Sequence, residues 1–254
     1  MHIDDNLAVE GTRRALAIAD EVFPATFKAD IPDAARITIA LLARCVTTTQ
    51  ACLHLAQLGR RSDLMVCVRT LYEHTVTLAW LLGGDDAEHR MLLWERYCDD
   101  QALRLDDDIV RLGGEPSIPV DTREQMAQAA SRLGSARMPV LADRAILADR
   151  EWAERLGLDS THRDAASLRR VYSVIFRVAS AVAHPTLAGL QFVTERGPDR
   201  VTIGAEPAGR AHEAMLPVPV LIGTALAVSA QALGKPNIQQ MNAYFEWLTG
   251  AGAK

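Results

Sequence analysis

The motifs of the common enzyme and metalloprotein classes are missing from this sequence. The four cysteines form no Cys-x-x-Cys pair, and no histidine stands at the spacing of a zinc ligand. There is no glycine-rich nucleotide-binding motif, no nucleophile elbow, and no Glu-x-x-His pair of the kind that di-iron bundles need. We therefore expect neither a bound metal nor an organic cofactor.

Positive charge and long apolar runs are also scarce. The chain has 27 Lys and Arg against 32 Asp and Glu, a formal net charge of −5, so no global basic field exists to hold a polyanion. The apolar runs are interrupted by Arg, Glu, His or Pro before they reach the roughly 20 residues of a membrane span. The first residues show no signal peptide. We expect a cytoplasmic protein that does not bind a membrane.

Apolar residues recur at helical spacing along most of the chain, and Gly or Pro ends most of these segments. The spacing predicts helices over about 4–22, 32–58, 62–83, 85–112, 122–133, 218–233 and 237–249, a long helix over 168–184, and shorter helices within 138–158. Most connections are short, which is typical of antiparallel neighbours. The fold class is therefore predicted to be all-α, an antiparallel helical bundle.

One segment departs from the helical pattern. Residues 190–204 hold two β-leaning runs around a Gly-Pro-Asp turn, which predicts a small β-hairpin insertion. We expect one helical domain over 1–254. Its core bundle spans about 30–188, and the hairpin and two closing helices follow in 189–250.

Two smaller features have ordinary structural interpretations. Cys45 and Cys52 are seven residues apart, so they share a helix face and are expected to be small core residues. The run Asp106, Asp107 and Asp108 is expected to be a solvated helix face, although three adjacent carboxylates could hold a cation weakly.

The helix predicted over 62–83 is apolar around its whole circumference, which indicates a central position in the bundle. Arg69 and Glu73 lie within it, four residues apart and therefore on one face. Because desolvating an ion pair is costly, this pair needs partners if it is buried, and removing Arg69 should destabilise the fold strongly.

A second polar feature lies in the helix predicted over 168–184, which is otherwise mostly apolar. Spacings of four, three and four residues place four side chains on one stripe: Ser173, Arg177, Ser180 and His184. Pro185 ends the helix there, so the imidazole is expected near the negative end of the helix dipole.

We expect Arg69 and Glu73 to face Ser180 and His184 across the bundle. Two interpretations of this cluster stay open. It is either a satisfied buried network that fixes the helix register, or a binding site whose guanidinium and imidazole groups recognise a phosphate or carboxylate and transfer a proton.

The Arg-x-x-x-Glu segment Arg69 to Glu73 and the later Ser-x-x-x-His segment Ser180 to His184, followed by Pro, resemble a widespread family of bacterial helical domains of unknown function. The resemblance covers most of residues 30–190. It implies a fold and no activity.

The spacing from Arg177 to His184 also resembles the Arg-x(4–6)-His motif of the HEPN superfamily. That resemblance implies a helical homodimer, related to metal-independent ribonucleases of toxin and phage-defence systems, with His184 as general acid and base and Arg177 as the phosphate clamp. Val178 departs from the family, where the residue after the Arg is usually polar. The segment RTLYEH, Arg69 to His74, fits the same loose spacing.

The sequence is therefore compatible with three functions. The first is a metal-independent ribonuclease or defence effector that binds RNA through Arg177 and His184. The second is a regulatory protein that binds a small anionic ligand in a cavity between the third and sixth long helices, with no catalytic activity. The third is an interaction module. The sequence leaves open whether the protein is an enzyme.

Overall fold

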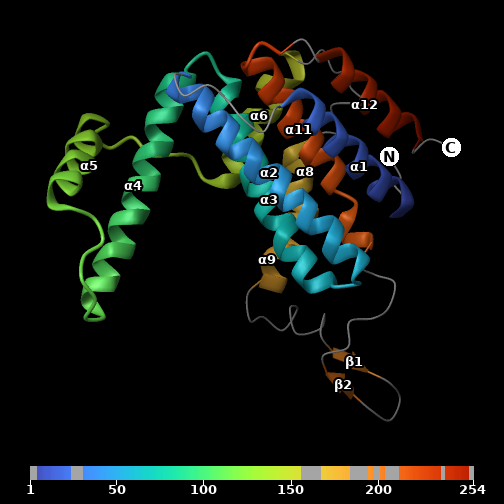
Figure 1. Cartoon of the computed structure of the whole chain (residues 1–254), viewed down its shortest axis with the longest axis horizontal. Helices are drawn as coiled ribbons and strands as arrows, with labels where there is room; N and C mark the ends of the chain where they lie inside the picture. Colours follow the sequence, from blue (N-terminus) through green and yellow to red (C-terminus); the bar gives the residue numbers. More distant parts are fainter. Residues whose placement is uncertain are drawn as a thin grey trace. The chain divides into compact units, whose positions relative to one another are not determined.

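The computed structural model describes residues 5–23, 31–155, 167–183, 194–196, 201–203, 212–235 and 238–251. The chain divides into two compact units (Figure 1): the first is formed by residues 1–83 and 141–254, and the second by residues 84–140. The single domain predicted over 1–254 stays a prediction.

The first unit is built almost entirely from helices, as the periodicity predicts, so the fold class is all-α. Its elements are α1 (Asp5–Val22), α2 (Asp33–Gln57), α3 (Arg61–Gly83), α6 (Leu141–Arg155), α8 (Leu168–Val171), the π-helical turn η1 (Tyr172–Phe176), α9 (Arg177–Ala183), the 3-10 helix η2 (His212–Met215), α11 (Val218–Ala232) and α12 (Ile238–Ala251).

The core of this unit lies along α3 and α11. Helix α3 packs against α2, α6, α9 and α11, and α11 packs in turn against α1, α2 and α12. Every residue from Val218 to Ala230 is buried. On the helix predicted over 168–184, Ser173, Arg177 and Val178 are exposed to solvent, whereas Leu168 and Ala179 are buried.

Helices α11 and α12 approach each other closely at Gly223. A Cβ atom added there would lie 2.6 Å from Cε1 of Tyr244, well inside normal contact distance. The Tyr244 hydroxyl donates to the backbone oxygen of Pro219 at 2.8 Å and lies 3.2 Å from that of Gly11. This tyrosine therefore ties α12 to the backbones of both α1 and the start of α11.

A tight turn joins α2 to α3, and the two helices lie side by side (Figure 1). Gly59 has φ of +69°, a conformation that glycine adopts at low cost, and the backbone N–H of Arg60 donates to the carbonyl of Leu55 at 2.9 Å. Further along the pair, Sγ of Cys45 lies 4.0 Å from Oγ1 of Thr75. These contacts fix the register of α2 against α3.

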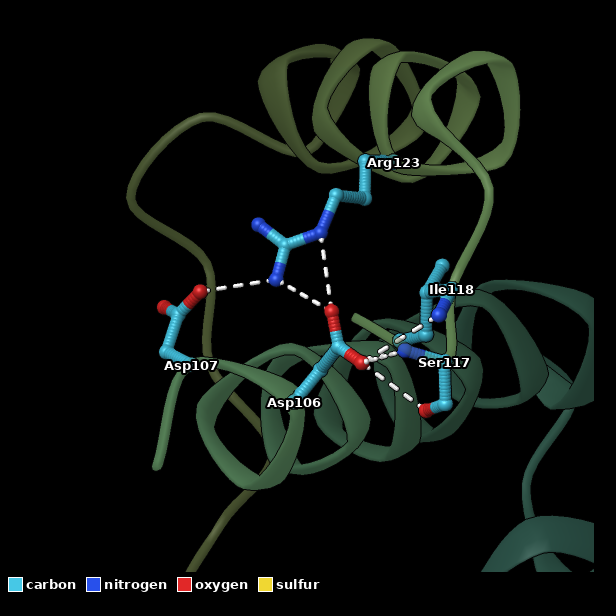
Figure 2. A network of polar contacts seen from close by, with 5 residues as sticks. All are labelled: Asp106, Asp107, Ser117, Ile118 and Arg123. Atoms are coloured by element: carbon cyan, nitrogen blue, oxygen red, sulfur yellow. Dashed lines mark hydrogen bonds and ion pairs between the residues drawn. The ribbon is translucent and has the colours of Figure 1, made fainter. Parts of the chain in front are cut away.

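The second unit consists of α4 (Ala87–Arg111), α5 (Val120–Arg132) and the segment between them, held together by Asp106 (Figure 2). Its carboxylate accepts hydrogen bonds from the backbone N–H groups of Ser117 and Ile118, from the Ser117 hydroxyl, and from Nε and Nη2 of Arg123. The Arg123 guanidinium and these other donors lower the pKa of Asp106 to about 2, against the opposing effect of its burial.

The expectation of a solvated acidic face is therefore wrong for Asp106, whose side chain is 1% exposed. It holds for Asp107 and Asp108, which are exposed. Since every bond to Asp106 comes from the loop and α5, this carboxylate folds α5 back onto α4. Its oxygens are occupied by protein donors, so the cation considered for this run has no support from the geometry.

The β-hairpin insertion predicted near 190–204 is corrected to a much smaller element. Strands β1 (Thr194–Arg196) and β2 (Val201–Ile203) pair antiparallel, with Glu195 opposite Thr202. The three pairs of this ladder are all the strand structure within the described residues. Strands this short add little stability of their own, so the fold depends on its helices.

By length and composition alone, two helices could cross a membrane, which the sequence analysis did not expect: α2 and the stretch Glu213–Ala232. The second of these is mostly buried inside the first unit, as a core helix of the same composition would be. The predicted cytoplasmic location stays a prediction.

Candidate functional site

The ion pair between Arg69 and Glu73 forms as predicted, but it is not deeply buried. Nε of Arg69 lies 3.2 Å from Oε1 of Glu73, and the two side chains are 28% and 42% exposed. The guanidinium carbon also lies 5.5 Å from the ring centre of Phe176, within the range of a cation–π contact. Arg69 therefore contacts the ring of Phe176, the last residue before α9.

Phe176 belongs to an aromatic cluster that fastens the helix over 168–183 to α3. The ring centres of Tyr72 and Phe176 are 5.2 Å apart, and those of Tyr172 and Phe176 are 5.1 Å apart and stacked. The buried Tyr72 hydroxyl donates to the backbone oxygen of Leu168 at 3.0 Å. Burial raises the pKa of Tyr72 well above its usual range, so the phenol stays protonated.

Asp149 on α6 holds the beginning of the same helix. Its carboxylate accepts from the backbone N–H groups of Leu168 and Arg169, at 2.8 and 3.0 Å, and from the Ser167 hydroxyl at 2.9 Å. Burial raises its pKa, and these three hydrogen bonds oppose that effect. Because a carboxylate at a helix N-terminus is favourable, Asp149 acts as a cap donated by another helix.

A second set of polar contacts joins α6 to α3. The buried Arg144 donates from Nη1 to Oγ1 of Thr77 at 2.7 Å, and Nε1 of Trp152 donates to the backbone oxygen of Ala79 at 2.6 Å. None of these residues was predicted from the sequence to belong to the site. Arg144 lies in a segment whose apolar residues recur at helical spacing, and its partner Thr77 is 67 positions away in the sequence. Its role is therefore evident only from the fold.

The predicted polar stripe is divided by the π-helical turn η1. Ser173 lies within the turn, is exposed, and donates to the backbone oxygen of Arg169 at 3.1 Å. Ser180 lies beyond it on α9, and its buried Oγ has no hydrogen-bond partner among the described residues. A π turn breaks the 100° spacing on which the stripe was predicted, so the two serines lie in different environments.

Arg177 is exposed at the first position of α9, and His184 lies outside the described residues. Whether Arg69 and Glu73 face Ser180 and His184 therefore stays a prediction. The roles assigned to Arg69, Glu73, Ser173, Arg177, Ser180 and His184 also stay predictions.

Arg169, Ser173 and Arg177 follow one another at intervals of four residues on the exposed side of this helix, and we call them the arginine face. Neither arginine forms an ion pair within the part of the chain that the structure describes. Two guanidinium groups about one helical turn to either side of a hydroxyl suit phosphate recognition, since guanidinium donors match phosphate oxygens.

The second Arg-x-x-x-x-His match, from Arg69 to His74, does not bring its residues together. Five positions along a helix turn the side chain by about 140°, which places Arg69 and His74 on different faces of α3. Burial lowers the pKa of His74, and the nearby Arg44 on α2 adds to that effect. Arg69 contacts Phe176 instead, so this segment is not a paired site.

A cavity of about 490 Å³ lies between α1 and α2. It is lined by Asn6, Val9, Glu10, Arg13, Leu53, Ala56 and Gln57. The small-ligand hypothesis placed its cavity between the third and sixth long helices, so this one was not anticipated. Among the described residues, no cluster of His, Cys, Asp and Glu gathers that could hold a metal ion.

The first unit is all-α, and buried polar contacts join its central helix α3 to α6 and to α8. It is therefore a helical domain. The family model named "Family of unknown function (DUF5677)" matches residues 35–200, so the chain belongs to that family. The matched range begins at the third residue of α2, extends past the end of α9, and contains all six residues predicted for the candidate site. Neither the curated proteins nor the solved structures contain a match to this chain.

Proposed function

We propose that this chain is a metal-independent ribonuclease of the HEPN type, with Arg177 as the phosphate clamp and His184 as the general acid and base. The observation that carries the proposal is the arginine face. A guanidinium group can offset charge on the scissile phosphate while an imidazole moves the proton, so the reaction needs no metal. The antiparallel bundle predicted for about 30–188 is kept as part of this proposal.

RNA affinity depends on neutralising phosphates. Because the chain is acidic overall, it can bind RNA only where its positive charges are concentrated locally. Arg170 is exposed beside Arg169 and adds a third guanidinium to this end of the helix. The pair Arg69 and Glu73 adds little net charge, so it is assigned to positioning through Phe176 rather than to binding RNA.

The test is cleavage of mixed RNA by the purified full chain in EDTA. Wild-type protein should cleave, His184→Ala should lose at least about 100-fold in rate, and Arg177→Ala should lose a comparable amount. Arg104→Ala, which removes an exposed arginine of α4, is the matched control and should cleave normally. Absence of cleavage by wild type, or equal cleavage by wild type and His184→Ala, removes the nuclease proposal.

The cavity between α1 and α2 favours a second candidate, the binding of a small anionic ligand without catalysis. Val9, Leu53 and Ala56 supply an apolar wall, and the exposed Arg13 supplies a cation at the rim. An anionic aromatic dye such as anilinonaphthalene sulfonate is a suitable probe. Its binding should weaken several-fold in Arg13→Ala and in Ala56→Leu, which fills the cavity, and binding unchanged by either variant removes this candidate.

The homodimer implied by the HEPN resemblance is also part of the proposal. A chain of 27.7 kDa should then elute in light-scattering chromatography with about twice that mass. A monomer at all concentrations that support cleavage contradicts it.

A further inference from the structure

The cavity between α1 and α2 has an apolar floor and a polar rim. Val9 and Leu53 on the floor are half-buried, and Ala56 is buried. The other lining side chains are exposed at the rim: Asn6, Glu10, Arg13 and Gln57. The volume of about 490 Å³ lies within the range of about 300 to 1,000 Å³ that is typical of small-molecule sites. The rim therefore offers one cation, one anion and two amides beside an apolar surface.

The two neighbouring arginines of α1 differ in what they contact. Arg14 donates from Nε and Nη2 to Oε1 of Glu10, at 3.0 and 2.5 Å. Its guanidinium carbon lies 3.9 Å from the ring centre of Trp247 on α12, and Arg14 does not line the cavity. Arg13 does line the cavity, and it forms no ion pair with any residue that the structure describes. The guanidinium of Arg13 is therefore available to a ligand.

Glu10 supplies the opposite charge at the same rim. Both hydrogen bonds from Arg14 end on Oε1, so Oε2 of Glu10 has no partner among the described residues. Glu10 and Arg13 are three positions apart on α1, which places their Cβ atoms about 5 to 6 Å from each other on one helix face. Because Glu10 pairs with Arg14 and not with Arg13, an anion and a cation stand side by side without neutralising each other. A ligand with both charges on neighbouring atoms can contact both groups.

Resting on the small-ligand function proposed above for this cavity, we infer that its ligand is a free α-amino acid with an apolar side chain. The carboxylate of the amino acid accepts hydrogen bonds from the Arg13 guanidinium, and its ammonium group donates to Oε2 of Glu10. Its side chain lies on Val9, Leu53 and Ala56, where removal of apolar surface from water adds affinity. The terminus of a peptide carries only one of the two charges, so it satisfies only one of the two groups at the rim.

The experiment titrates the purified full chain in a calorimeter with three probes: L-phenylalanine, 3-phenylpropanoate, which lacks the amine, and phenethylamine, which lacks the carboxylate. Phenylalanine should bind, and each analogue should bind about 10-fold more weakly, because each loses one charge-assisted hydrogen bond. Equal affinity for phenylalanine and phenylpropanoate overturns the inference and leaves the anionic-ligand function standing. Absence of phenylalanine binding also overturns it, and binding of the anionic dye by the same protein then shows whether the cavity takes another anion.

Two variants assign the two contacts. Glu10→Gln should weaken the binding of phenylalanine about 10-fold and leave that of phenylpropanoate unchanged, whereas Arg13→Ala should weaken both acids and leave phenethylamine unchanged. Asp20→Asn, which removes an exposed carboxylate further along α1, is the matched control and should bind all three probes like wild type. Circular dichroism verifies that each variant is folded, and the wild-type comparison does not depend on them. A folded Glu10→Gln variant that binds phenylalanine as tightly as wild type contradicts the inference.

Discussion

The carboxylate of Asp106 lies 2.6 Å from Nη2 of Arg123, an ion pair that joins α4 to α5 across seventeen positions of sequence. The carboxylate belongs to a buried side chain, and the arginine is one-third exposed. The same carboxylate anchors the loop at Ser117 and Ile118 (Figure 2). One acidic side chain therefore organises the second unit.

This network should make the second unit sensitive to acid. The folded pKa of Asp106 is about 2, below the ordinary value of 3.8, so its contribution to stability is complete above about pH 4 and is lost as the pH falls toward 2. Hydrogen exchange at residues 112–123 should accelerate over that window. Asp106→Asn should show fast exchange at all pH values, whereas Asp107→Asn should resemble wild type.

The partial exposure of Arg69 and Glu73 changes the effect expected from removing Arg69. Since solvent screens the pair with Glu73, Arg69→Ala should lower the free energy of unfolding by about 1 kcal/mol or less. A deeply buried pair would cost several times that amount. Urea denaturation measures the difference, and a loss of about 3 kcal/mol or more would show that the pair is desolvated in solution.

Removing the hydroxyl of Tyr72 should leave the backbone oxygen of Leu168 without its donor. We expect Tyr72→Phe to destabilise the fold by about 1 to 2 kcal/mol, because that oxygen has no comparable access to water. Tyr97→Phe on the exposed face of α4 is the control and should be neutral. If the two variants unfold at the same urea concentration as wild type, the hydrogen bond does not stabilise the fold.

The close approach of α11 and α12 should tolerate no side chain at Gly223. Gly223→Ala places a methyl group against the ring of Tyr244 and should cost about 1 to 3 kcal/mol. Gly250→Ala meets no atom within 4 Å and should be neutral or stabilising by up to about 1 kcal/mol, since alanine favours the helix. Thermal unfolding of both variants decides whether the packing differs as described.

The helices could be predicted because their signals are local. Gly59, Gly113 and Gly134 were expected to stop helices, and each has positive φ at such an end. Asp106 and Asp149 could not be assigned, because their partners come eleven to twenty residues later in the sequence, on other elements. A capping residue donated by another helix leaves no mark at a fixed spacing.

The candidate site was predicted in part for the same reason. The spacing of four between Arg69 and Glu73 is a local property of a helix, so the pair was found and its contact is confirmed. The exposure of the pair could not be predicted, because it depends on which helices cover that face of α3. The division of the polar stripe at η1 was also missed. The contacts with Tyr72 and Asp149 come from other helices, so they leave no signal in the sequence of this helix.

The π turn Tyr172–Phe176 stores about one residue more than an α-helical turn would, because its hydrogen bonds span five residues instead of four. Leu168 is anchored before this turn, and Arg177 is exposed directly after it. Deleting one residue inside the turn would restore a regular α-helix and leave the directions of the side chains on α9 nearly unchanged, because the turn already absorbs that residue. A deletion in α8 would instead rotate Arg177 by about 100° and would also move the buried Ala179 out of the core.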